Sequence, residues 1–157
     1  MSDDAHDVAV FLDALRAAEE AGAAVLNAWV AACRLDELRG GLRAIAEREA
    51  VHAGLLAGRL RELGAPCTAV VNELMRAGAV SRFGSADLSD EEKLSLVLAR
   101  YPDDVTVTKP IRRMMESLDG DPETRELLRL VAEGESATIA WFRAYQRALG
   151  RRIPLPE

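Results

Sequence analysis

The feature that most constrains the fold is a long stretch of helical periodicity whose apolar stripe is interrupted by two polar residues. Between Asp36 and Leu63, steps of three or four residues place apolar side chains on one face of a helix, with Glu49 and His52 one turn apart in the middle. A buried carboxylate costs several kcal/mol unless a partner compensates it. The sequence therefore predicts a polar centre inside a helical core. The stripe consists of Leu38, Leu42, Ile45, Glu49, His52, Leu56, Leu60 and Leu63.

Length and composition predict one all-α domain over residues 1–157. The chain is 49% hydrophobic but only 4% aromatic, and its apolar residues are mostly Ala, Leu and Val, which favours packed helices over sheets. A net charge of −6 argues against a nucleic-acid partner. No apolar run is long enough for a membrane span, and the N-terminus lacks signal-peptide character. We therefore expect a cytoplasmic protein without a membrane partner, in which Cys33 and Cys67 are reduced.

Helix start and stop signals predict an antiparallel helix pair over residues 4–64. The first helix is expected from about Asp4 to Arg34, and Glu19 interrupts its apolar stripe. Gly22, on the same stripe, would permit close approach of another helix. The second helix stops at Gly64, which a proline follows two residues later. The break between the two helices is so short that they must form a hairpin.

A crossover over residues 65–103 is expected to carry two short helices. The first is amphipathic, from Thr68 to about Ala77. The second begins after the N-cap signal at Ser89 and ends at Pro102.

The second helix pair, residues 104–150, begins with a weak helix. The stretch from Val105 to Thr108 is strand-like by local propensity, and Pro110 lies inside the helical pattern. We therefore expect regular helix only over 109–118, with an irregular start. An extended tail is expected over 151–157.

The second helices of the two pairs are related by a repeat without gaps. Residues 42–64 align with residues 128–150 at an offset of 86 (135 − 49), and Glu135 aligns with Glu49. Chance similarity between two Ala- and Leu-rich helices is the alternative, but it does not predict that both polar interruptions fall in the same register. We infer a duplicated helix hairpin.

These features resemble the ferritin-like superfamily, in particular four-helix bundles of the rubrerythrin and bacterioferritin type. The resemblance rests on two helix pairs joined by a long crossover and on the Glu49-x-x-His52 motif within an apolar stripe. It implies a bundle of two hairpins in which the first helix of each pair supplies a glutamate and the second a Glu-x-x-His, together holding two metal ions, usually iron. For this chain the resemblance implies that the metal ligands are Glu19, Glu49, His52 and Glu135.

The chain departs from the family pattern at two positions. Thr138 replaces the second histidine, and Val105 stands where the remaining glutamate is expected. Asp104, beside Val105, is a secondary candidate ligand, as are Thr138 and Glu20. Three carboxylates and one imidazole suit iron or manganese, and Thr138 or a water would occupy an open position for O2 or substrate.

Three explanations of the polar centre remain open. The first is a metal ion with oxidase or oxygenase chemistry. The second is a buried salt bridge to Lys109, Arg112 or Arg113, which would make the chain a metal-free scaffold or binding module. Its apolar faces would then bind a second copy of the chain, forming a homodimer, or a small hydrophobic molecule. The third is a metal-free acid–base site in which His52 relays a proton.

Overall fold

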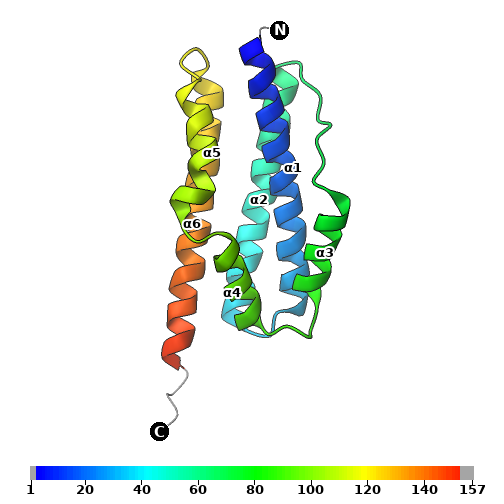
Figure 1. Ribbon diagram of the computed structural model, residues 1–157, viewed down its shortest axis with the longest axis vertical. Helices are drawn as coiled ribbons and strands as arrows, with labels where there is room; N and C mark the ends of the chain where they lie inside the picture. The colour runs from blue at the N-terminus through cyan, green and yellow to red at the C-terminus, as the bar shows by residue number, and fades with distance from the viewer. Residues whose placement is uncertain (1–2, 153–157) are drawn as a thin grey trace. The chain divides into compact units, whose positions relative to one another are not determined.

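The computed structural model describes residues 3–152, which form six α-helices and no strand (Figure 1). This confirms the all-α prediction. The chain divides into two compact units, the first ending at Asp87 and the second beginning at Leu88. Within the described range, every helix is too short or too polar to cross a membrane.

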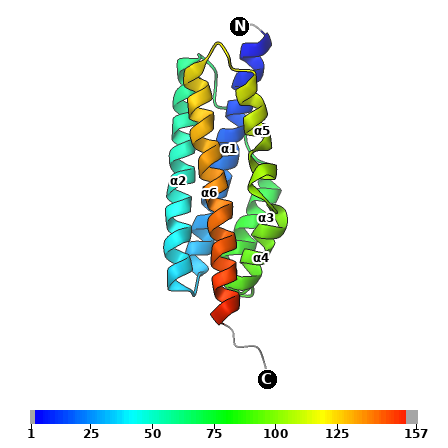
Figure 2. The same cartoon turned by 90° about the vertical axis from the view of Figure 1, so that its left-hand side faces the viewer.

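The first unit is built on a hairpin of two long helices, α1 (Asp3–Ala32) and α2 (Asp36–Glu62), and α3 (Glu73–Gly84) packs against α1 (Figures 1 and 2). The first predicted helix pair is therefore confirmed. Arg39 holds the turn of the hairpin, because its Nη2 and Nε donate to the carbonyl oxygen of Cys33 at 2.6 and 3.2 Å. After α2 the chain turns at Gly64, whose φ of 70° lies in the left-handed region.

The apolar stripes predicted for α1 and α2 form the core of this unit. Trp29 of α1 is fully buried, and its ring contacts that of Phe83 on α3 with the centroids 5.4 Å apart. This aromatic contact joins α3 to the hairpin. The fully buried side chains of the two predicted stripes are Leu12, Leu38, Leu42, Leu56 and Leu60.

A buried ion pair on α1 fixes the extended segment between α2 and α3. Oδ2 of Asp13 accepts hydrogen bonds from the backbone N–H groups of Thr68 and Ala69 at 2.8 and 2.6 Å. Arg16 donates to Oδ1 of Asp13 at 2.8 Å and to the carbonyl oxygen of Ala69 at 2.7 Å. Burial acts to raise the pKa of Asp13, but the hydrogen bonds from Ala69, Thr68 and Arg16 outweigh it and hold that pKa below its ordinary value.

The helix predicted from Thr68 to Ala77 is wrong at both ends. Asp13 holds residues 68 and 69 in an extended conformation, so α3 begins only after Asn72, whose side chain accepts a hydrogen bond from the backbone N–H of Met75. The helix then continues to Gly84, because the contact of Phe83 with Trp29 offsets the low helix propensity of its glycines.

The second unit comprises α4 (Asp90–Arg100), α5 (Asp104–Glu116) and α6 (Pro122–Arg152). Both α5 and α4 pack against α6, α5 along its N-terminal half and α4 closer to its C-terminal end (Figures 1 and 2). The predicted cap of α4 is confirmed, since Ser89 and Glu92 form a capping box. The predicted stop at Gly150 is wrong, because an exposed glycine costs a helix only about 1 kcal/mol and no turn is needed there. Residues 153–157 of the predicted tail lie outside the described residues.

Helix α5 begins at Asp104 and continues through Pro110, so it starts five residues before the predicted start of regular helix at residue 109. Two side chains stabilise its first turns. Asp103 accepts a hydrogen bond from the backbone N–H of Thr106 at 2.6 Å, and the hydroxyl of Thr108 donates to the carbonyl oxygen of Asp104 at 2.7 Å. The first bond satisfies a free N–H group of the first turn, and the second adds a donor to a carbonyl oxygen of that turn, so both stabilise the helix before Pro110.

Candidate functional site

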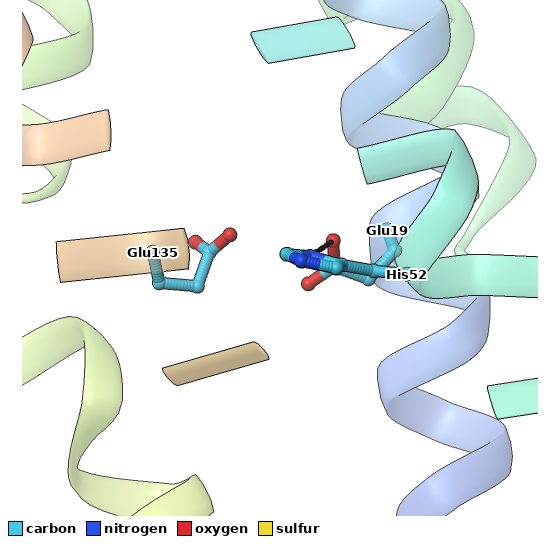
Figure 3. Close-up of side chains that lie close together, drawn as sticks. All are labelled: Glu19, His52 and Glu135. Atoms are coloured by element: carbon cyan, nitrogen blue, oxygen red, sulfur yellow. Dashed lines mark hydrogen bonds and ion pairs between the residues drawn. The ribbon is translucent and has the colours of Figure 1, made fainter. Parts of the chain in front are cut away.

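A glutamate of α1 and a histidine of α2 form a buried pair inside the first unit (Figure 3). Nδ1 of His52 lies 3.1 Å from Oε2 of Glu19, and only 3% and 5% of the two side chains are exposed. A proton on Nδ1 makes this contact a hydrogen bond, and a second proton on the ring makes it an ion pair. The polar interruptions of the α1 and α2 stripes thus meet, as predicted from their spacing.

The carboxylate of Glu49, one turn from His52 on α2, lies against Gly22 of α1. A Cβ atom added at Gly22 would lie 2.2 Å from Oε2 and 3.2 Å from Cδ of Glu49. Gly22 therefore leaves open the space that this carboxylate occupies. Since Gly22 follows Glu19 by one turn, the contact lies one turn along the α1–α2 interface from the Glu19–His52 pair.

The donor atoms of the Glu19–His52 pair suit a hard or borderline cation. Carboxylate and imidazole groups are ordinary ligands of iron and manganese. Two adjacent ligand atoms, each about 2.1 Å from one ion, are about 3 Å apart when they meet at a right angle. The 3.1 Å spacing of Nδ1 and Oε2 fits this geometry as well as it fits a hydrogen bond. The residues present therefore fit a metal ion.

The second unit carries the candidates that the sequence repeat identified. Glu135, also drawn in Figure 3, is partly exposed on α6, and Thr138 is buried one turn further on. The two residues share one face of α6, as Glu49 and His52 share one face of α2. Val105, where the family pattern requires a glutamate, is 68% exposed on α5.

Asp104 lies at a different level of the α5–α6 hairpin from Glu135. It lines a cavity of about 280 Å³ whose other walls come from α6, beyond Thr138. Two guanidinium groups make this cavity polar, so Asp104 has a favourable setting without a metal ion. The α6 residues that line the cavity are Ile139, Ala140, Arg143 and Arg147.

The remaining charged candidates have exposed positions. Oε1 of Glu20 accepts a hydrogen bond from Nη1 of Arg16 at 2.7 Å, and its side chain is 56% exposed. The three cations that were expected to replace a metal ion are all exposed on α5, namely Lys109, Arg112 and Arg113. Nε of Arg112 donates to the hydroxyl of Thr108 within the same helix.

Two features of the first unit escape sequence reasoning. The spacing of Asp13 and Arg16 is common on solvated helix faces, so no local signal indicates that they bind a distant segment. Gly22 does signal close approach, but its neighbours in sequence do not reveal that a carboxylate of α2 makes that approach.

Comparisons with protein-family models, with curated proteins and with solved structures find no match for this chain. Its function is therefore inferred from its own residues.

Proposed function

We propose that this chain is a ferritin-like protein that binds iron or manganese through a partial carboxylate–histidine site. The observation that supports the proposal is the buried Glu19–His52 pair, with Glu49 one turn away against Gly22. One hairpin thus presents a glutamate from its first helix and a Glu-x-x-His from its second. Carboxylate-bridged metal proteins of the four-helix type bind iron with this set of side chains.

Each of these side chains has a defined role in the proposal. Oε2 of Glu19 and Nδ1 of His52 would bind one ion together, and Glu49 would supply a second carboxylate from the adjacent turn. His52 can bind only as the neutral imidazole, so metal affinity should decrease as the pH is lowered. The bound ion would supply redox or Lewis-acid chemistry toward O2 or a small substrate.

Glu135 is proposed as a further metal ligand because it aligns with Glu49 in the sequence repeat. We also propose a four-helix bundle, on the basis of the family resemblance. Each observed hairpin would form one half of that bundle. Because Thr138 replaces the second histidine, we propose a site for one ion.

A second candidate function is a metal-free scaffold or binding module. The specific observation in its favour is that the contact between His52 and Glu19 already gives each of these buried side chains a hydrogen-bond partner within the protein. Exposed apolar side chains just before and at the start of α3 would then bind a second copy of the chain or a small hydrophobic molecule. They are Val70, Leu74 and Met75.

Metal analysis distinguishes the two functions. Protein purified without chelator is loaded with Fe(II) under anaerobic conditions or with Mn(II), desalted, and assayed for bound metal by mass spectrometry. We expect about one ion per chain in the natural protein and a large loss in Glu49→Ala. Glu47→Ala is the matched control, because Glu47 is exposed on the same helix and should leave the metal content unchanged.

The contribution of Glu135 is tested in the same way. Glu135→Ala should lower the metal content, whereas Glu133→Ala should not, since Glu133 is exposed and paired with Arg129. A natural protein that retains neither metal after loading would exclude the metal-binding function and leave the scaffold.

A further inference from the structure

We propose that the cavity between the start of α5 and the C-terminal half of α6 binds a small carboxylic acid that also carries a hydroxyl or an amino group. All the residues that line this cavity belong to the second unit. The Glu19–His52 pair belongs to the first unit, so this binding site does not depend on the proposed metal site.

The α6 wall of the cavity contains one stripe of the helix. Ile139, Arg143 and Arg147 are spaced by four residues, so they lie above one another on one face. Ile139 is buried and gives the cavity an apolar part, whereas the two arginines give it positive charge. Like charges four residues apart destabilise a helix, and an anion bound between them would offset that cost. The stripe therefore suits an anionic group attached to a short carbon chain.

Asp104 of α5 lies across the cavity from this stripe. Within residues 3–152, neither the carboxylate of Asp104 nor the guanidinium of Arg143 has a hydrogen bond or a close ion pair. Both groups therefore keep their hydrogen-bonding capacity for a ligand. A guanidinium can donate two parallel hydrogen bonds to one carboxylate, while an ionised carboxylate can only accept. The ligand group beside Asp104 must accordingly be a donor.

The positive charge of Arg143 acts on the start of α5. The pKa of Asp103 is lowered, first by the hydrogen bond from the backbone N–H of Thr106 and in smaller part by the charge of Arg143. Asp103 caps α5 through that hydrogen bond, so Arg143 can still bind a further anionic group. A doubly charged anion such as phosphate would be repelled by Asp103 and Asp104 more strongly than a carboxylate, which favours the carboxylate.

The volume of the cavity limits the ligand to a few carbon atoms. It is about 280 Å³, whereas pockets for drug-sized ligands have about 300–1,000 Å³. Propionate, L-lactate and L-alanine form a matched set of small acids for this volume. They differ only in the group on the second carbon, which is a hydrogen, a hydroxyl or an ammonium.

Titration of the full-length protein with these three acids tests the proposal. The protein is labelled with ¹⁵N, freed of metal by chelation and dialysis, and followed by NMR. We expect the amide signals of Asp104, Ala140 and Arg143 to shift, and the signal of His52 to stay unchanged. Lactate and alanine should bind more tightly than propionate, because propionate offers no donor to Asp104. The tighter of the two shows whether the donor is a hydroxyl or an ammonium.

Two substitutions separate the roles of the arginines and of Asp104. Arg143→Gln should weaken the binding of all three acids about tenfold, because it removes a hydrogen bond between charged groups. Asp104→Ala should remove the preference for lactate and alanine without weakening propionate. Arg125→Gln and Asp119→Ala are the matched controls, since both residues lie near the other end of the α5–α6 hairpin and should leave all three affinities unchanged.

Three results would overturn the proposal. If none of the acids shifts these amides at millimolar concentration, the cavity is a solvated groove. If propionate binds as tightly as lactate and alanine, Asp104 selects no donor. Tighter binding of inorganic phosphate would assign the cavity to a different class of ligand. If Arg143→Gln lowers the melting temperature, Arg147→Gln replaces it in the same titration, because Arg147 is exposed. Each of these failures leaves the metal-binding function standing.

Discussion

Nδ1 of His52 on α2 lies 3.1 Å from Oε2 of Glu19 on α1, a contact between residues 33 positions apart in the chain. Both side chains are buried, so each compensates for much of the cost of removing the other from water. The contact fits a hydrogen bond and also fits two neighbouring ligands of one metal ion. Its effect on stability can be measured in the absence of metal.

Replacing His52 by alanine should destabilise the metal-free protein. Glu19 would lose its hydrogen-bond partner from α2 while remaining buried, and such a loss costs about 1–3 kcal/mol. Urea unfolding in the presence of a chelator, followed by circular dichroism, measures the change. His6→Ala is the control, because His6 is exposed on α1 and should change the free energy of unfolding by less than about 0.5 kcal/mol. Equal effects of the two substitutions would show that the buried pair adds no stability.

Replacing Asp13 by asparagine should remove an acid-dependent part of the stability. The pKa of Asp13 is lowered in the folded protein, so its contribution is complete above about pH 4, where the unfolded residue is ionised, and is lost as the pH falls toward the folded pKa. At pH 7 we expect Asp13→Asn to cost about 1–3 kcal/mol, and this cost should shrink toward pH 3. Unfolding free energies at the two pH values test this.

Asp7→Asn is the control for the Asp13 experiment, because Asp7 is exposed on the same helix. It should have little effect at either pH. A cost of Asp13→Asn that is the same at pH 7 and pH 3 would contradict the assigned role of its ionised carboxylate.

Alanine substitution should have opposite effects at two neighbouring glycines. Gly64 has a φ of 70°, a left-handed conformation that costs an alanine about 1–2 kcal/mol, so Gly64→Ala should lower the melting temperature. Gly58 lies within α2 with open space around it, so Gly58→Ala should stabilise by about 0.5–1 kcal/mol. Differential scanning calorimetry measures both, and a shift of the same sign would refute the assigned end of α2.

Replacing Pro110 by alanine should stabilise α5. The helix continues through this proline, so alanine restores an N–H donor for the carbonyl oxygen of Thr106 and removes a steric clash. We expect a gain of about 1–2 kcal/mol, less than the full helix-interior penalty because proline also restricts the unfolded chain. Pro122→Ala is the control, since Pro122 is the first residue of α6, where proline is favoured. A loss of stability in Pro110→Ala would mean that this proline is required where it stands.

The helices that local patterns predicted correctly contrast with those that they did not. α1 and α2 follow an uninterrupted helical period, and α4 begins with a capping box, so neighbouring residues carry the signal. The wrong boundaries depend on side-chain hydrogen bonds to the backbone, one set long-range and one local, that helical periodicity does not report. Asp13 delays the start of α3 from 55 positions away, and the bonds at Asp103 and Thr108 allow α5 to begin before its proline.

The amino-acid sequence by itself determined the helical class and the inward face on which Glu19, Glu49 and His52 lie, because a period of 3.6 residues reports which side of a helix is buried. Tertiary structure alone decided that His52 bonds to Glu19 while Glu49 rests against Gly22. The partner of each side chain depends on the axial register of α1 against α2, which packing across the hairpin sets and no local pattern encodes.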